Sequence, residues 1–159
     1  MALFLGIDPG LASVGFGVVE GQGDDFTFVD CGVIKTPAGL AMEERLLMIK
    51  KDLDELLKQF KPDAVGVEEL FFAKNVKNAI AVAHVRGVIL ERVAEHGVPL
   101  FELTPLQLKN NICGYGQADK KQVQEMVKRL LHLKKAPHPD DAADALGIAI
   151  YAGRVARFS

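Results

Sequence analysis

Hydrophobic residues in the first quarter of the chain are grouped into short runs that polar turns separate. The first run, residues 2–7, is apolar almost throughout and ends at Asp8, which a Pro-Gly pair follows. This pattern is typical of a buried strand that meets a turn. Apolar runs at residues 14–19 and 26–34 predict a second and a third strand, with the polar residues 22–25 between them. We therefore expect a meander that begins with a hairpin.

Helical and strand patterns alternate over the rest of the chain. Between Met42 and Phe60, apolar residues recur mostly at spacings of three and four, which predicts an amphipathic helix. Further along, Asp119 and Gln122 resemble a capping box at the start of another helix. The elements predicted here are a helix at residues 42–60, a strand at 64–68, a helix at 76–96 closed by Gly97, a strand at 98–103, and helices at 105–111, 123–133 and 140–157.

The order of these elements predicts an α/β fold. Three strands in a meander, followed by strands that alternate with helices, favour a mixed five-stranded sheet flanked by helices. Its first part would be antiparallel and its second part parallel. At 159 residues the chain has the length of one domain and is large enough to bury a core. We expect residues 1–159 to form a single domain.

The composition excludes several classes of protein. Apolar residues make up 49% of the chain and charged residues 25%, as in an ordinary globular protein. No apolar run approaches the roughly 20 residues that a membrane span needs, and the first residues lack the basic region of a signal peptide. Cys31 and Cys113 form neither a disulfide framework nor a zinc pattern. These features favour a location in the reducing cytoplasm.

Charge is distributed unevenly along the chain. Residues 1–70 contain 6 Lys/Arg and 13 Asp/Glu, a net charge of −7, whereas residues 71–138 contain 11 and 5, a net charge of +6. A basic zone suits phosphate binding because neutralised phosphates release counterions. Lysines and arginines also decorate solvated helix faces, so the asymmetry favours a nucleic-acid partner without establishing one.

Four carboxylates stand in otherwise apolar surroundings. Asp8 and Glu68 each end an apolar strand, while Asp141 and Asp144 begin a helix that continues as an apolar sequence. A spacing of three residues places Asp141 and Asp144 on one face of that helix. If the two strands are neighbours, Asp8 and Glu68 come within reach of the same helix.

Two neighbouring acids leave alternatives open. Glu68 and Glu69 point to opposite faces of a strand, so at most one of them can join the other carboxylates. Asp140 precedes Asp144 by four residues and is a rival to Asp141.

Converging carboxylates repel one another and raise one another's pKa values unless a cation lies between them. Ligation by oxygen alone favours Mg²⁺ or Mn²⁺ over zinc, because no Cys/His cluster accompanies these acids. Two such ions would suit a phosphodiesterase, one activating the attacking water and the other stabilising the leaving 3′-oxygen. The residues therefore predict a metal-dependent nuclease.

A set of motifs along the chain resembles RuvC, the family of bacterial Holliday junction resolvases. The motifs are Gly6-Ile7-Asp8-Pro9-Gly10 with Gly15-Phe16-Gly17, then Pro62-Asp63, Val67-Glu68 and Phe71, then Asp141-Ala142-Ala143-Asp144-Ala145-Leu146. Together, in this order and spacing, they extend over almost the whole chain. The resemblance implies an RNase H-like fold, a homodimer, and paired symmetrical cuts across a four-way DNA junction in recombination and DNA repair.

The resemblance also implies roles for individual residues. The expected ligands of two Mg²⁺ ions per subunit, which Mn²⁺ can replace, are Asp8, Glu68, Asp141 and Asp144. Glu68 is thereby preferred to Glu69, and Asp141 to Asp140. Lys109 and Lys120 match catalytic positions near the scissile phosphate, where a cation stabilises developing charge. The expected DNA contacts are Phe71, Lys74, Lys109, Tyr115, Lys120 and Lys121, and residues 114–118 match a mobile loop over the DNA.

The helix at residues 76–96 bears a stripe of small and apolar residues that would suit close contact with a second helix. The stripe consists of Ala79, Ile80, Ala83, Gly87, Val88 and Leu90. Core packing within one subunit explains the same pattern, and the resemblance places part of the dimer interface here. A two-fold axis would set two active sites against opposite strands of a junction. The family also implies docking with the RuvA–RuvB branch-migration complex.

Three other interpretations compete. The glycine motif around Asp8 is similar to the phosphate hairpin of sugar kinases and actin-like ATPases, but those folds need two lobes and this chain has room for one. A YqgF-like nuclease acting on RNA is disfavoured because such proteins usually lack the glutamate that ends the fourth strand. A non-catalytic junction-binding module is disfavoured because four clustered carboxylates are costly to keep without a metal.

Overall fold

The computed structural model describes residues 1–69 and 76–156. Within them lie β1 (Ala2–Asp8), β2 (Ser13–Gln22), β3 (Asp25–Lys35), α1 (Met42–Phe60), β4 (Ala64–Glu68), α2 (Val76–Glu95), β5 (Leu100–Leu103), α3 (Pro105–Cys113), α4 (Lys120–Leu130) and α5 (Asp140–Ala156). The order of strands and helices is the one that the sequence predicts. In this described part, each helix is too short or too polar to cross a membrane.

The five strands form one mixed sheet in the order β3-β2-β1-β4-β5. β1 pairs antiparallel with β2, and β2 with β3, as expected of a meander. β4 pairs parallel with both β1 and β5. The predicted α/β class, with an antiparallel part followed by a parallel part, is therefore confirmed, and the architecture is RNase H-like.

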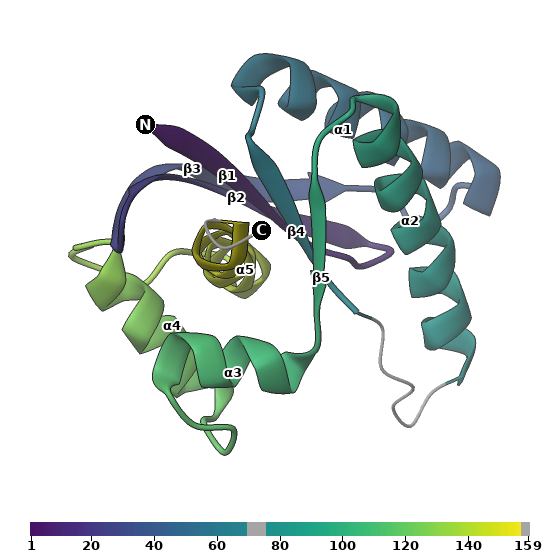
Figure 1. Cartoon of the computed structure of the whole chain (residues 1–159). Helices are drawn as coiled ribbons and strands as arrows, with labels where there is room; N and C mark the ends of the chain where they lie inside the picture. The colour runs from purple at the N-terminus through teal and green to yellow at the C-terminus, as the bar shows by residue number, and fades with distance from the viewer. Residues whose placement is uncertain (70–75, 157–159) are drawn as a thin grey trace.

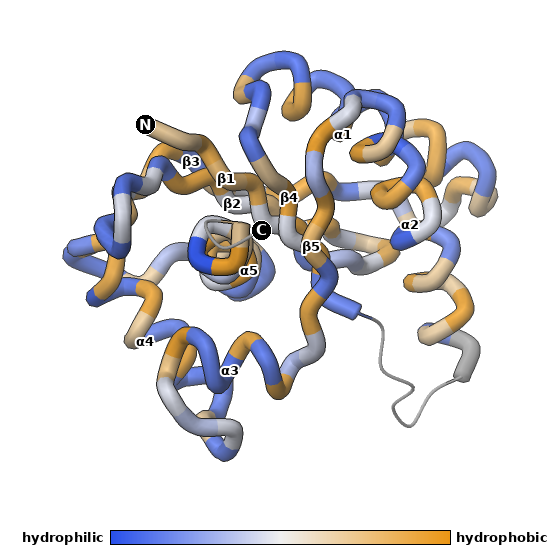
Figure 2. Tube along the Cα trace, viewed as in Figure 1, coloured by the Kyte–Doolittle hydropathy of each residue, from blue (hydrophilic) through white to orange (hydrophobic). Residues whose placement is uncertain are grey.

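Helices cover both faces of the sheet (Figure 1). α1 and α2 pack on one face, where Ile49, Leu53 and Ile89 join Leu5 and Val67 of the sheet in a buried cluster. Hydrophobic and hydrophilic residues alternate along α1, as its amphipathic pattern predicts (Figure 2). α5 covers the opposite face, and α3 and α4 pack against its outer side. Because α5 is enclosed on both sides, most of its residues are buried, which explains its apolar sequence.

α5 approaches the sheet closely because glycines form the surface beneath it. A Cβ atom at Gly6 of β1 would lie 2.0 Å from the carbonyl oxygen of Ala145, and one at Gly15 of β2 would lie 2.2 Å from that of Asp141. Neither distance is compatible with a side chain unless the helix moves. The glycines therefore allow the first turns of α5 to lie directly over the ends of β1 and β2.

Some element boundaries differ from the predicted ones. α4 begins at Lys120 rather than at residue 123, because Asp119 caps it and Gln122 bonds back to the Asp119 N–H, closing a turn that starts at Lys120. It ends at Leu130 rather than at residue 133, and His132 just beyond has a left-handed φ of 55°. This shift places Lys120 in the first turn of the helix. The predicted last residue of α5, 157, lies outside the described residues.

Candidate metal centre and its surroundings

The parallel pairing of β1 with β4 brings two of the predicted carboxylates to the same edge of the sheet. Ile7 pairs with Val67, so the next residues, Asp8 on β1 and Glu68 on β4, lie side by side at the ends of the two strands. Ile7 and Val67 are fully buried under α1 and α2. Because successive side chains of a strand alternate between faces, Asp8 and Glu68 point to the other face, toward α5.

Three acidic side chains meet at this edge. One carboxylate oxygen each from Asp8, Asp141 and Asp144 lies within 4.8 Å of the other two. Asp141 and Asp144 come from the first turns of α5, where the spacing of three residues puts both on the side that faces β1. Asp140, the rival of Asp141, is exposed and is not a member of this group.

Burial and mutual repulsion perturb these acids strongly. The pKa of Asp8 is raised from 3.8 to about 8, chiefly by burial and further by the negative charges of Glu68, Asp144 and Asp141. The positive charge of Lys120 opposes this rise in the pKa of Asp8. Without a cation, the folded protein therefore keeps the Asp8 carboxyl protonated at neutral pH.

Glu68 and Asp144 are perturbed in the same direction. Burial raises the pKa of Glu68, and the charge of Asp144 raises it further. Burial also raises the pKa of Asp144. Glu68 lies outside the group of three mutually close oxygens, but the charge interactions tie it to both Asp8 and Asp144.

A divalent cation fits this donor set. Every side-chain donor in the cluster is a carboxylate oxygen, and hard cations such as Mg²⁺ and Mn²⁺ prefer oxygen ligands. A cation among the carboxylates would replace their repulsion by attraction and release the proton held on Asp8. The raised pKa values are thus the physical sign that the cluster suits a metal.

Two lysines approach the cluster from α3 and α4. Lys120 Nζ lies 3.4 Å from Asp144 Oδ2, while the rest of the Lys120 side chain is largely exposed. Lys109 and Lys120 both lower the pKa of Glu68 through their positive charges. A hollow of about 200 Å³ brings these groups together, and its lining consists of Glu68, Pro105, Leu108, Lys109, Lys120, Val123 and Asp144.

Of the remaining predicted DNA contacts, Lys121 and Tyr115 are described by the structure, and neither lines the hollow at this cluster. Lys121 is exposed on α4. Tyr115, with 43% of its surface exposed, lies after α3 and borders a separate hollow that Gln122 and Arg129 also line. Phe71 and Lys74 lie outside the described residues.

A second hollow, of about 250 Å³, also borders Glu68. Its lining consists of Asp8, Pro9, Glu68, Glu69, Val82, Arg86 and Pro105. Arg86 of α2 donates from Nε to the main-chain carbonyl oxygen of Glu68, at 3.2 Å. The sequence contains no signal that distinguishes this arginine from others on the same helix.

A buried polar contact supports the loop that follows Asp8, and sequence reasoning missed it. The Thr36 hydroxyl donates to the Leu11 carbonyl oxygen and accepts a hydrogen bond from Arg45 Nε. Arg45 also donates to the Thr36 carbonyl oxygen, and both side chains are more than nine-tenths buried. The one available signal was an arginine at a core-facing position of α1, because Arg45 precedes the core residue Ile49 by one helical turn.

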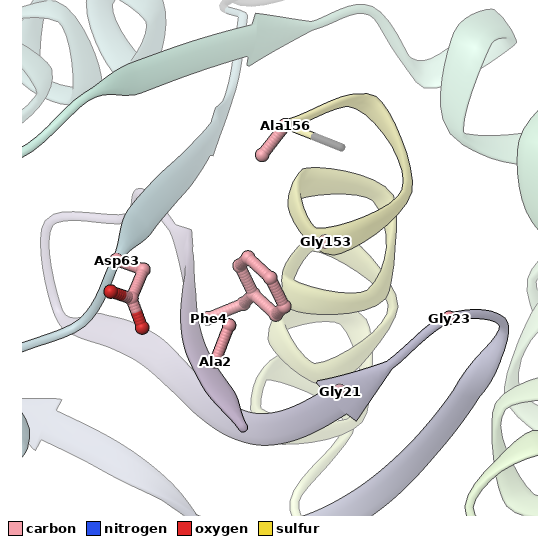
Figure 3. A pocket seen from close by; sticks show the side chains of 7 residues that line it. All are labelled: Ala2, Phe4, Gly21, Gly23, Asp63, Gly153 and Ala156. Atoms are coloured by element: carbon pink, nitrogen blue, oxygen red, sulfur yellow. The ribbon is translucent and has the colours of Figure 1, made fainter. Parts of the chain in front are cut away.

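A larger hollow, of about 350 Å³, lies at the opposite end of α5 and lacks this chemistry (Figure 3). Apolar and glycine positions dominate its lining, which comprises Ala2, Phe4, Gly21, Gly23, Asp63, Gly153 and Ala156. Its one carboxylate, on the exposed Asp63, accepts a hydrogen bond from the Leu3 N–H. The carboxylate cluster, not this hollow, is therefore the candidate site.

Comparisons with known proteins agree with this assignment. A family model described as "Crossover junction endodeoxyribonuclease RuvC" matches residues 4–152. A protein of that name from Alkaliphilus oremlandii is 48% identical over 99% of this chain and 96% of its own length. Another from Thermosipho melanesiensis is 53% identical over 91% of this chain and 92% of its own length. The solved structure of T. thermophilus RuvC in complex with a Holliday junction substrate has a TM-score of 0.94 and 37% identity, covering 99% of this chain and 96% of that one.

Proposed function

Because this chain belongs to the RuvC family of crossover junction endodeoxyribonucleases, we propose that it resolves four-way DNA junctions by paired, metal-dependent cuts in recombination and DNA repair. The observation that carries the proposal is the meeting of Asp8, Asp141 and Asp144 within 4.8 Å at one edge of the sheet. Metal ions held at such a site catalyse phosphodiester hydrolysis. The four-way junction is inferred as the substrate because the chain belongs to this family.

The proposed metal ligands are Asp8, Glu68, Asp141 and Asp144. They would hold two Mg²⁺ ions per subunit, with Mn²⁺ able to substitute. When bound, such ions activate an attacking water and stabilise the leaving 3′-oxygen. Glu68 would complete the set from β4, since its carboxylate faces the same side as Asp8 and interacts with Asp144.

The two lysines would act on the phosphate. Lys120 is held beside the cluster by Asp144, and Lys109 lines the same hollow as Glu68. Both ammonium groups would stabilise negative charge that develops on the phosphate during the cut. Contacts with the rest of the DNA are proposed for Phe71, Lys74, Tyr115 and Lys121.

The active form is proposed to be a homodimer that uses α2. Ile80 of this helix has 54% of its surface exposed, and Ala83 and Gly87, on the same side, are also exposed. Ala79, by contrast, is buried within the subunit. An exposed stripe of small and apolar residues suits close contact with the same helix of a second subunit. Docking with the RuvA–RuvB branch-migration complex is proposed on family grounds alone.

A cleavage assay on a mobile synthetic four-way junction tests the proposal. With Mg²⁺, the wild-type protein should cut two strands at symmetrical positions, and Asp8→Asn should bind the junction without cutting it. Asp140→Asn is a matched control, because this exposed acid neighbours the cluster without belonging to it. Full cleavage by Asp8→Asn would refute the metal centre. Junction binding without any cutting by the wild type, with either Mg²⁺ or Mn²⁺, would instead favour a binding module.

A further inference from the structure

Arg86 connects helix α2 to the ends of two neighbouring strands. Its Nε donates to the carbonyl oxygen of Glu68 at the end of β4, and its Nη2 donates to Oε1 of Glu102 on β5. The arginine side chain is 17% exposed and that of Glu102 is 40% exposed. A planar guanidinium can satisfy two such acceptors at once because its donors form a rigid fork.

The strand register explains why one side chain reaches both acceptors. β4 and β5 are parallel, and Val67 pairs with Glu102 while Glu68 pairs with Leu103. Val67 belongs to the cluster under α1 and α2, so Glu102 projects to that face, where Arg86 lies. The Glu68 side chain projects to the opposite face, toward α5. Arg86 therefore reaches the main-chain carbonyl of Glu68 from the α2 side of the sheet, and it lines a hollow with Asp8 and Glu68 at the strand ends.

Arg86 bonds to the main chain of Glu68 and not to its carboxylate. The positive charges that lower the pKa of Glu68 belong to Lys109 and Lys120. The contribution of Arg86 is instead geometric, because a main-chain carbonyl held in place restricts the direction of its own side chain. Glu68 is the last residue of β4, and the next N–H, that of Glu69, bonds to the Leu103 carbonyl oxygen. Arg86 thus acts where the regular strand ends.

We propose that Arg86 is a positioning residue, which fixes the end of β4 against β5 so that the Glu68 carboxylate faces Asp8 and Asp144. This inference rests on the proposed function insofar as it takes Glu68 as a metal ligand. Partners that orient metal ligands typically change metal affinity by roughly 10- to 100-fold when they are removed. Misplacement of a reacting group by about 1 Å can lower a rate by about 100-fold.

The test compares three variants of α2. Arg86→Gln removes the fork and the charge, and Arg86→Lys keeps the charge without the fork. Arg92→Gln is the matched control, since Arg92 is similarly shielded on the same helix and forms ion pairs with Asp54 on α1 and with Glu91. Glu102 is 40% exposed, so its ion pair with Arg86 contributes modest stability and the variants should remain folded.

Binding of Mn²⁺ is measured directly, from the electron paramagnetic resonance signal of the free ion. Arg86→Gln should weaken Mn²⁺ binding by about 10-fold and raise the Mg²⁺ concentration for half-maximal cleavage by a similar factor. Arg86→Lys should lie between this variant and the wild type. Arg92→Gln should match the wild type in both measurements, and junction binding in Ca²⁺ should be unchanged in all three.

Wild-type Mn²⁺ binding and Mg²⁺ dependence in a folded Arg86→Gln protein would overturn the inference. If Arg86→Gln does not fold, Glu102→Gln and Arg86→Lys take its place, since each disturbs one end of the Arg86–Glu102 contact. Wild-type Mn²⁺ binding and Mg²⁺ dependence in both variants would likewise overturn the inference. A wild-type protein that binds Mn²⁺ without cutting junctions would refute the proposed function while the binding comparison still decides the role of Arg86.

Discussion

Gly15 of β2 lies directly beneath Asp141 of α5, so close that a Cβ atom on the glycine would stand 2.2 Å from the Asp141 carbonyl oxygen. A proposed metal ligand is therefore positioned by the absence of a side chain on a neighbouring strand. The start of α5 can lie over β1 and β2 only while that space stays empty.

Gly15→Ala should displace the start of α5 and weaken the metal site. Forcing an extra methyl into a packed interior typically costs about 1–3 kcal/mol, and the displacement would separate Asp141 from Asp8. We expect a lower free energy of unfolding in urea and weaker Mn²⁺ binding. Gly39→Ala is the control, because a Cβ atom there meets nothing within 4 Å. Unchanged Mn²⁺ binding in Gly15→Ala would contradict this account.

The pH dependence of stability should reveal the protonated Asp8. Its pKa is about 8 in the folded protein and 3.8 ordinarily, so the folded state binds more protons between these values. The free energy of unfolding of the metal-free protein should therefore fall as the pH rises from about 4 to about 8. Chemical denaturation across this range measures the slope. In Asp8→Asn the fall should be smaller, and an equally steep fall would show that other groups cause it.

Metal binding should become tighter as the pH rises, because the ligands must be deprotonated. The pKa values of Asp8, Glu68 and Asp144 are all raised in the metal-free protein, so Mg²⁺ competes with protons below about pH 8. Thermal denaturation should show a larger rise in Tm on adding Mg²⁺ at pH 8 than at pH 6. Equal shifts at the two pH values would mean that the titrating carboxyls do not bind the metal.

Lys120→Ala should slow cleavage without preventing metal binding. Removing one charge-stabilising donor from an active site typically lowers kcat by about 100- to 1000-fold, and Lys120 Nζ is only 3.4 Å from Asp144. Single-turnover cleavage at saturating Mg²⁺ measures the effect. Lys128→Ala, on the same helix, removes a lysine that lies 3.9 Å from Glu125, and it serves as the control. Equal rates in the two variants would argue against a role for Lys120 in the reaction.

Thr36→Val should destabilise the protein, because it removes one of the hydrogen-bond partners of a buried arginine, the Thr36 hydroxyl. The Thr36 hydroxyl joins Arg45 to the Leu11 carbonyl oxygen, and burying polar groups without partners costs about 1–3 kcal/mol each. Urea denaturation should show this loss. Thr36→Ser keeps the hydroxyl and should retain most of the stability, so equal losses in both variants would point to packing rather than hydrogen bonding.

The sequence by itself determined the order of the elements. Apolar runs, helical periodicity and capping residues act over a few neighbouring positions, so they can be recognised without knowledge of the fold. The Asp119–Gln122 capping box was recognised in this way. The equivalent box of α3, formed by Thr104 and Gln107, was just as visible and was missed. The candidate acids could also be recognised from the sequence, because a carboxylate within an apolar run is unusual.

Only the tertiary structure decided which of these groups meet. The i, i+3 spacing of Asp141 and Asp144 was local, but their approach to Asp8 joins residues more than 130 positions apart. That approach depends on the pairing of β1 with β4 and on the glycine surface under α5. The contact of Arg86 with Glu68 likewise depends on how α2 crosses the ends of β4 and β5. Strand register and helix packing result from the whole core, and no short stretch of sequence contains them.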